Sequence, residues 1–312
     1  MVTIKDVAKE AGVGVGTVSR YINGDAAVKT KNRILIDDAV KKLGYEVNAI
    51  ARSMKTQKTM TIGVIVHTLA NMFSMKVIEN IENVVSKAGY SVIVAGCGGD
   101  EKLQREKITD MKKRMVDGIV IMPVARNSQK IKNIVGDTAC ILVDRLLDKN
   151  IFDSVTVDNE TIVYEKMSEV VKLGFKKFAI IEGPENVSNA EERKKGFYRA
   201  LKKNNIERGF SVSADYDING GFDAMRKVLE NSDTEAVFIS NYEQLVGGLK
   251  ALNGSDRKIY IIGFDGIEFP WLLDNPFTFI EQPIEEIGKR AANLLLERIS
   301  NPNMEIKNIV IR

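Results

Sequence analysis

The chain contains 312 residues, of which 44% are apolar and 28% are charged, proportions typical of globular proteins with apolar cores. No apolar run approaches the length of about 18 to 20 residues that crosses a bilayer, and the charged first segment, MVTIKDVAKEAG, lacks the apolar region of a secretory signal. The two cysteines, Cys97 and Cys140, are too few for a disulfide framework or a metal cluster. We therefore expect a cytoplasmic protein with no metal site and no membrane association.

Charge is distributed unevenly along the chain. Residues 1–60 contain eleven Lys and Arg against six Asp and Glu, a net charge of +5, whereas residues 61–312 contain 34 basic and 36 acidic residues, a net charge of −2. A basic segment joined to a near-neutral body favours a module that binds a polyanion. A slightly basic, solvated surface would carry the same net charge. The motifs in this segment must therefore distinguish a polyanion-binding module from such a surface.

Residues 3–45 predict three short helices and no strand. The first begins after Thr3, where Asp6 completes an imperfect capping box. The other two are predicted over Val15–Ile22 and Lys31–Leu43, and the second of these ends at Gly44. The apolar side predicted for this last helix consists of Ile34, Leu35, Ala39, Val40 and Leu43.

Beyond Thr61, buried strands and amphipathic helices alternate. Runs rich in β-branched residues predict strands within 61–69, 91–96, 118–124, 139–144, 178–184, 235–240 and 258–265. Helical segments such as 75–89 and 284–299 lie between or after them. This alternation is typical of parallel sheets with helices on both faces, and the length favours two such sheets.

The segment GVGVGTVSRYINGD, residues 12–25, suggests two functions. Its alternate glycines look like a phosphate-binding loop. The dinucleotide fingerprint, however, follows a strand and has Gly at its sixth position. Here the preceding element is predicted to be a helix, and the sixth position is Thr17 counted from Gly12 or Ser19 counted from Gly14. A helix-turn-helix fits better, because a short helix, a Gly turn and a second helix with exposed polar residues place that second helix in a DNA major groove. We therefore expect no cofactor.

The second helix would read DNA through side chains that face outward, namely those of Val15, Gly16, Thr17 and Arg20. Arg20 can donate two hydrogen bonds to guanine, and Val15 can contact a thymine methyl group. Thr17, Ser19 and Tyr21 can bind phosphates and set the register on the duplex.

The stretch TIKDVAKEAGVGVGTVSRYING, followed by LGYEVNAIARSM, resembles the DNA-binding head of the lac/gal repressor family. TIGVIV, VDGIVIMPV, VDNETI, IIGFDG and IEQPIEEIG then stand in the order that this family uses, and GFDG with NPFTFIEQPI is most similar to its sucrose-type repressors. The resemblance implies an all-α helix-turn-helix head over 1–46, a hinge helix and linker over 47–60, and an α/β periplasmic-binding-protein-like body over 61–312. Two doubly wound parallel-sheet subdomains would form the body, an N-subdomain of about 61–158 and 285–302 and a C-subdomain of about 159–284 and 303–312.

The resemblance also implies how the hinge contacts DNA. Asn48 would begin a short helix in the minor groove, and Ala51 and Met54 would wedge between the central base pairs, which kinks the duplex. Because two hinges are needed, it implies a homodimer on a palindromic operator. The residues assigned to DNA binding are Thr3, Val15, Gly16, Thr17, Ser19, Arg20, Tyr21, Asn23, Asn48, Ala51, Arg52 and Met54.

Five positions depart from the family pattern. The family usually has Leu and Pro where this chain has Met54 and Val47, and Ser as the helix N-cap where it has Gly14 and Lys29. Replacing an N-cap Ser by Gly costs only a few tenths of a kcal/mol. Tyr242 stands where the family commonly has Asp, so we expect a cap or a hinge contact there to be lost or remade.

A small ligand is expected at the carboxyl ends of the body's strands. The resemblance places Arg193 and Asp265 on ligand hydroxyls, to which guanidinium and carboxylate groups bond in pairs. Phe73 and Tyr216 could stack on a sugar ring, although Phe73 could instead belong to the core. Asp144 and Arg145 could simply pair with each other, and Gln282 could bond only to backbone. The predicted ligand-binding residues are Phe73, Asp144, Arg145, Asn189, Arg193, Tyr216, Asn241, Asp265 and Gln282.

Together these observations predict a DNA-binding transcriptional regulator that represses a carbohydrate operon and responds to a sugar or sugar phosphate. The alternative within the same class is a nucleoside or purine effector, and the sequence leaves open whether the ligand is an inducer or a co-repressor. A secreted two-lobed solute-binding protein is disfavoured by the basic head. A thiol enzyme would need Cys97 close to His67, the single histidine.

Overall fold

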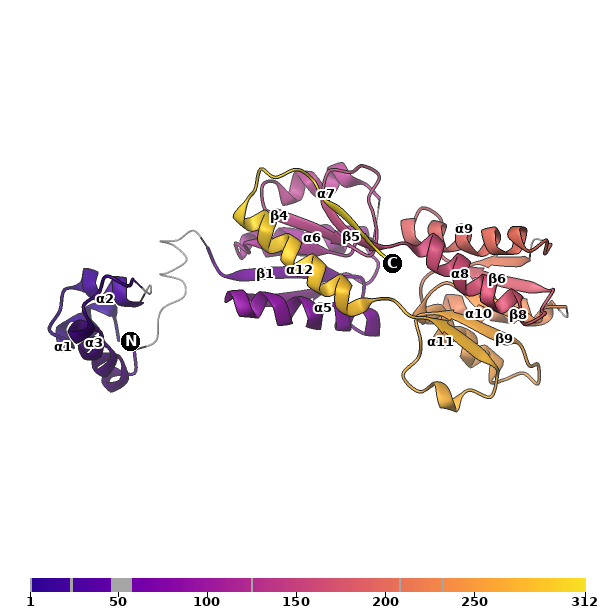
Figure 1. The fold of residues 1–312 in the computed structure, drawn as a ribbon, viewed down its shortest axis with the longest axis horizontal. Coiled ribbons are helices and arrows are strands. Elements are labelled where there is room, and N and C mark those ends of the chain that lie inside the picture. Colours follow the sequence, from indigo (N-terminus) through magenta and orange to yellow (C-terminus); the bar gives the residue numbers. More distant parts are fainter. Residues whose placement is uncertain (1, 23–24, 46–57, 125, 208, 232) are drawn as a thin grey trace. The chain divides into compact units, whose positions relative to one another are not determined.

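The computed structural model describes residues 2–22, 25–45, 58–124, 126–207, 209–231 and 233–312. The chain divides into two compact units, residues 1–59 and 60–312, which we call the head and the body (Figure 1). Within the described residues, no helix is both long enough and apolar enough to cross a membrane.

The described residues of the head form three helices: α1 (Ile4–Glu10), α2 (Val15–Ile22) and α3 (Thr30–Leu43). At the start of α1, Asp6 reaches back to the N-cap residue, because the backbone N–H and the hydroxyl of Thr3 donate to Asp6 Oδ2 at 2.8 and 2.7 Å. Gly44 ends α3 in the left-handed region, with φ at 60°, where glycine has no steric cost. The buried core between the helices consists of Val7, Ala8, Ala11, Val18, Ile36 and Ala39.

The predicted apolar side of α3 is partly wrong. Ile34 and Leu35 are 58% and 40% exposed, whereas Ile36 is fully buried. The side that packs in the head core is formed by Ile36, Ala39, Val40 and Leu43. This is the i, i+3, i+4, i+7 spacing of one helix face. Three consecutive apolar residues point in three directions from a helix, so packing against α1 and α2 selects Ile36.

Two parallel sheets organise the body. The first contains β1 (Thr61–Val66), β2 (Ser91–Gly96), β3 (Gly118–Ile121), β4 (Ala139–Val143), β5 (Asp153–Val157) and β11 (Asn308–Ile311), in the order β11-β5-β4-β3-β1-β2. The second contains β6 (Phe178–Glu182), β7 (Phe210–Ser213), β8 (Ala236–Ile239), β9 (Tyr260–Phe264) and β10 (Phe277–Ile280), in the order β10-β9-β8-β6-β7. The prediction of two parallel sheets is therefore confirmed.

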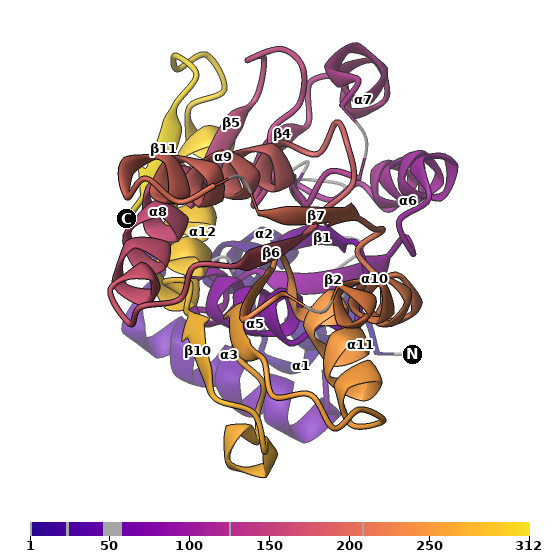
Figure 2. The same ribbon diagram turned by 90° about the vertical axis from the view of Figure 1, so that its right-hand side faces the viewer.

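Helices cover both faces of each sheet. On the first sheet, α5 (Met72–Val85) and α12 (Ile284–Ser300) lie on one face, and α6 (Glu101–Lys113) and α7 (Ser128–Val135) on the other (Figure 1). On the second, α8 (Asn159–Val171) and α9 (Ser188–Lys203) lie opposite α10 (Ile218–Glu230) and α11 (Tyr242–Leu252) (Figure 2). Val64 packs with α5 and α12 while Ile65 packs on the opposite face, because side chains alternate along a strand. Each sheet with its helices is one subdomain.

Four strands were not predicted, and one of them corrects a domain boundary. β5 has the sequence DSVTV, whose polar residues interrupt the apolar pattern, yet all five residues are buried. Asp153 is tolerated there because Arg298 Nε and Nη2 lie 2.6 and 2.8 Å from its carboxylate oxygens. β11 pairs with β5 in the first sheet. The prediction that residues 303–312 belong to the C-subdomain is therefore wrong, because the hydrogen bonds of β11 extend the edge of the first sheet.

Candidate functional site

Strands of both sheets lead into one cleft in the body. It lies at their carboxyl ends, after β1, β3 and β4 of the first subdomain and after β8, β9 and β10 of the second. The described residues that line it are His67, Thr68, Asn71, Phe73, Ser74, Met122, Asp144, Arg145, Asn189, Arg193, Tyr216, Asn241, Tyr242, Glu243, Asp265 and Gln282. The structure thus brings together all nine residues that the sequence predicted for ligand binding.

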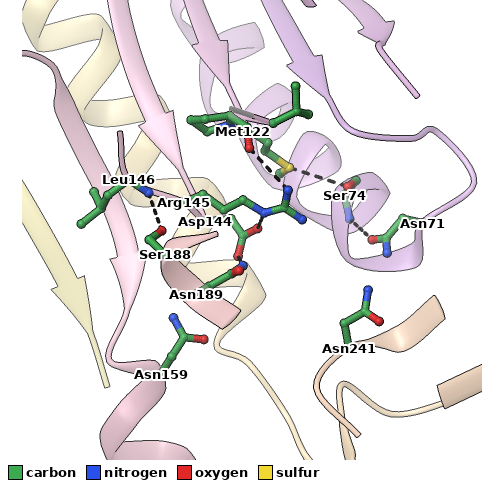
Figure 3. A network of polar contacts seen from close by, with 12 residues as sticks. Asn71, Ser74, Met122, Asp144, Arg145, Leu146, Asn159, Ser188, Asn189 and Asn241 are labelled. Carbon is green, nitrogen blue, oxygen red and sulfur yellow. Dashed lines mark hydrogen bonds and ion pairs between the residues drawn. The ribbon is translucent and has the colours of Figure 1, made fainter. Parts of the chain in front are cut away.

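Asp144 joins the two subdomains across this cleft. It follows β4 with its backbone in the left-handed region, at φ 70°, and its Oδ1 accepts a hydrogen bond of 3.0 Å from Asn189 Nδ2 on α9 (Figure 3). Arg193 Nη2, one turn further along α9, lies 3.8 Å from the same oxygen. Arg145 Nε lies 3.3 Å from Asp144 Oδ2, so the expected local pair forms as well. A ligand that contacted this carboxylate would therefore affect both subdomains.

Arg193 is held in one orientation by its surroundings. Its side chain is 3% exposed, Nε donates to Asn159 Oδ1 at 2.9 Å, and Nη1 donates to the Ser240 carbonyl at 2.8 Å. The guanidinium carbon lies 3.4 Å from the centre of the Phe264 ring. Stacking and hydrogen bonds fix the plane of a guanidinium, so Arg193 is a preorganised donor at the cleft.

Asp265 and Gln282 form a pair on the second subdomain's side of the cleft. Gln282 Nε2 lies 2.9 and 3.2 Å from the two carboxylate oxygens of Asp265, so Gln282 orients a side chain and does not bond only to backbone. Burial raises the pKa of Asp265 to about 6, against the lowering effects of Arg193 and Gln282. At neutral pH this carboxylate is mostly ionised and can accept hydrogen bonds from ligand hydroxyls.

Three buried polar atoms of the cleft have no hydrogen-bond partner among the described residues. They are Asn189 Oδ1, the Tyr216 hydroxyl and Arg145 Nε, whose contact with Asp144 is an ion pair. A buried polar atom without a partner costs about 1–3 kcal/mol, so these atoms favour a polar molecule in the cleft. Phe73, by contrast, packs in the core of the first subdomain, as the alternative interpretation expected, and also lines the cleft.

Asn71 and Glu243 line the cleft without having been predicted. Asn71 Nδ2 donates to Glu243 Oε1 and Asn241 Nδ2 donates to Glu243 Oε2, both at 2.6 Å. The side-chain oxygens of Asn71 and Asn241 cap α5 and α11. Near Tyr242, therefore, the helix has a cap, and the neighbouring Glu243 contacts the other subdomain.

The remaining unpredicted residues of the cleft are His67, Thr68, Ser74, Met122 and Tyr242. His67, Thr68 and Met122 come directly after β1 and β3. Their position at strand ends was a signal that could have identified them. Ser74 and Tyr242 lie in the first turns of α5 and α11, and only the packing of these helices brings them to the cleft.

On the head, α2 presents a surface of the predicted kind. Val15 is 42% exposed, and Gly16 and Arg20 are exposed beside it. A Cβ on Gly16 would meet no atom within 4 Å, so the fold does not require glycine there. Tyr21 donates its hydroxyl to Asp37 Oδ1 at 2.5 Å, which gives this group a partner within the head. Its contact with phosphate stays a prediction.

The structure shows less about the other residues that were assigned to DNA binding. Thr17 and Ser19 are partly exposed on α2, and the Thr3 hydroxyl is bonded to Asp6. Lys29 stands at the N-cap of α3 and makes no side-chain capping bond, as this departure from Ser predicts. Five assigned residues lie outside the described residues, namely Asn23, Asn48, Ala51, Arg52 and Met54.

Comparison with known families covers both units. Residues 3–48 match the bacterial regulatory proteins of the lacI family, and residues 59–312 match the periplasmic binding proteins and sugar binding domain of the LacI family. The chain belongs to the LacI family. It is therefore a DNA-binding transcriptional regulator, with a helix-turn-helix head and a periplasmic-binding-protein-like body, as the sequence predicted.

Known members resemble this LacI-family chain along nearly their whole length. The ribose operon repressor of Escherichia coli (strain K12) is 31% identical over 98% of the chain and 95% of the relative. The transcriptional repressor PurR of Aliivibrio salmonicida (strain LFI1238) is 29% identical over 98% and 94%. A crystal structure of the lac repressor dimer bound to operator and the anti-inducer ONPF has a TM-score of 0.85 at 22% identity, covering 99% of this chain and 96% of that one, and shows the shared fold.

Membership of the LacI family places this chain among regulators, and the residues of the thiol-enzyme alternative are not arranged for catalysis. Cys97 is fully buried and its Sγ donates to the Val66 carbonyl at 3.2 Å. Burial raises the pKa of this thiol, and a protonated thiol is a poor nucleophile. Burial, together with Arg145, lowers the pKa of His67, so this imidazole is neutral at neutral pH.

Proposed function

We propose that this LacI-family regulator is a homodimeric repressor whose affinity for a palindromic operator is set by a carbohydrate bound in the cleft. One observation carries the proposal. The Asp144 carboxylate of the first subdomain lies within contact distance of Asn189 and Arg193 of the second. A ligand seated there would bond to both subdomains at once, which is the requirement for coupling its binding to their relative position.

The chemistry of the cleft favours a polyhydroxylated ligand. Asp144 and Asp265 accept hydrogen bonds, Arg193 donates them, and neighbouring sugar hydroxyls can do both. Tyr216 adds an aromatic face and an unpaired hydroxyl. The names of the ribose operon and lac repressors support a sugar. The name of PurR supports the alternative of a purine, but a planar base would leave more of these carboxylate oxygens without donors.

Regulation would follow from the connection between the cleft and the head. The first subdomain continues directly into the head through the segment before β1. In a dimer, a ligand that changes the position of the first subdomains would change how both heads reach the two half-sites. Such coupling is reciprocal, so operator must change ligand affinity by the factor by which ligand changes operator affinity.

The experiment has two parts and uses the full-length protein. First, random duplexes are selected for binding, and sugars, sugar phosphates, nucleosides and purines are screened by thermal shift. Second, the affinity of the best ligand is measured with and without the saturating selected operator. We expect a palindrome, a sugar among the ligands, and equal coupling factors in both directions. Selection of no palindrome, or ligand affinity that operator leaves unchanged, would refute the proposal.

A matched pair of variants tests the role of the carboxylate. Asp144→Asn removes the charge that faces Asn189 and Arg193, whereas Asp223→Asn makes the same change at an exposed position of α10. We expect the first to weaken sugar binding by about 10- to 100-fold, as for loss of a charge-assisted hydrogen bond. The second should leave it unchanged.

A further inference from the structure

Glu243 places a carboxylate between the first turns of two helices that belong to different subdomains. It lies in the first turn of α11, and its two oxygens accept hydrogen bonds of 2.6 Å from Asn71 and from Asn241. Asn71 caps α5, and Asn241 caps α11. The amino-terminal ends of helices carry partial positive charge and attract anions. The chain's own carboxylate therefore lies where these two ends would favour an anion.

The charges that line the cleft sum to a negative value. Three carboxylates, those of Asp144, Glu243 and Asp265, face two guanidiniums, those of Arg145 and Arg193, and no lysine is among the lining residues that the structure describes. Both guanidiniums already contact groups of the chain, although Arg145 Nε makes no hydrogen bond. Arg193 donates to Asn159 and to the Ser240 carbonyl, and Arg145 lies against Asp144 and the Pro123 carbonyl.

A phosphorylated ligand would thus enter a site in which both guanidiniums already lie against the Asp144 carboxylate and the lining carboxylates outnumber them. It would bring about −2 charges beside Glu243, at the position where the helix ends would otherwise attract them. A neutral sugar meets no such repulsion, because its hydroxyls can donate to the carboxylates and accept from the guanidiniums and amides.

We infer that Glu243 is a specificity-determining residue, which makes the cleft bind uncharged sugars and reject their phosphorylated forms. This inference rests on the proposed function, since it assumes that the cleft binds a carbohydrate. It narrows the ligand from sugars in general to neutral ones. Glu243 acts in two ways, because its charge repels a phosphate and its oxygens occupy the Asn71 and Asn241 amides that a phosphate would use.

The size of the effect follows from Coulomb's law. Two unit charges about 5 Å apart, at an effective dielectric constant of about 20, change an equilibrium by on the order of 100-fold, and solvent screening reduces this. We therefore expect the wild-type protein to bind a neutral sugar at least about 10-fold more tightly than its phosphate ester. Glu243→Gln should reduce this ratio by about 10-fold or more, since it removes the charge and keeps the size of the side chain.

The test measures binding of matched pairs by calorimetry with the full-length protein: ribose and ribose 5-phosphate, glucose and glucose 6-phosphate, and fructose and fructose 6-phosphate. Inorganic phosphate is an additional probe, and we expect it to bind Glu243→Gln more tightly than the wild type. Two controls separate charge from structure. Glu243→Asp keeps the charge and should still reject phosphates. Glu191→Gln breaks another contact between the subdomains, the 2.8 Å ion pair with Arg126, and should leave the ratio unchanged.

Three outcomes decide against the inference, and they differ from failure of the proposed function. Equal wild-type affinity for a sugar and its phosphate overturns the role of Glu243, and so does a ratio that Glu243→Gln leaves unchanged. An equal effect of Glu191→Gln would assign the selectivity to cleft closure and overturn it as well. If neither the wild type nor Glu243→Gln binds any of the six sugars and phosphate esters, and the thermal-shift screen finds no other sugar, the proposed carbohydrate ligand itself is refuted.

Discussion

The substitution Asp265→Asn tests whether the Asp265 carboxylate, which is placed to bind ligand hydroxyls, lowers the unfolding free energy of the protein at neutral pH. Asp265 lies in left-handed backbone at φ 67°, a conformation that Asn tolerates as well as Asp. Its partner Gln282 can still donate to the side-chain oxygen of Asn. The substitution therefore removes one ionisable group while it preserves the backbone and the size of the side chain.

The expected magnitude comes from the pKa of this group. Burial raises the pKa of Asp265 from 3.8 to about 6, so the folded protein binds this proton more tightly than the unfolded chain does. The resulting stability is fully present below about pH 4 and is lost as the pH rises through 6. A shift of about two units corresponds to roughly 3 kcal/mol at neutral pH, and partial exposure of the side chain to solvent reduces this to about 1–3 kcal/mol.

The assay is urea unfolding of the full-length wild type and Asp265→Asn at pH 4.5 and pH 7.5. The unfolding free energy of the variant minus that of the wild type should increase by about 1–3 kcal/mol from pH 4.5 to pH 7.5. The variant should also lose sugar binding at pH 7.5. Asp256→Asn, at an exposed loop position, is the control and should show no such change. If the difference in unfolding free energy between wild type and Asp265→Asn were the same at both pH values, the reasoning from burial would be refuted.

Three further predictions concern other parts of the chain. Arg298→Met should lower the unfolding free energy of the body by about 3–5 kcal/mol in denaturant titrations, because it leaves the Asp153 carboxylate buried and unpaired; a loss below 1 kcal/mol would contradict this. Gly16→Ala should stabilise the head by about 0.5–1 kcal/mol, since a Cβ there meets no atom, and should change operator selection in binding assays. A thermal unfolding curve that shows destabilisation would argue against an unconstrained helical position. Deletion of residues 1–59 should leave sugar affinity in calorimetry within about twofold, since the body is a separate compact unit; loss of binding would show that the head takes part in the site.

Several features of this protein were predictable from local sequence. The helix α2 has the predicted bounds because a Gly turn precedes it and its inward residues repeat at helical spacing. All seven predicted strands exist because β-branched runs are typical of strands buried on both faces. The nine predicted ligand-binding residues meet in one cleft, since strand ends in parallel sheets share an edge and the family resemblance assigned two of them to ligand. In contrast, β5 escaped prediction because its Asp153 and Ser154 find partners far along the chain.

Local sequence alone determined the helices of the head, seven of the body's parallel strands and part of the set of polar side chains at their ends, because caps, turns and periodicity act within a few residues. Tertiary structure decided which apolar residue of α3 is buried, to which sheet β11 belongs, and that Glu243 reaches Asn71. The last contact joins residues that are 172 positions apart. Such contacts depend on how whole subdomains pack, and no pattern within a short segment contains that information.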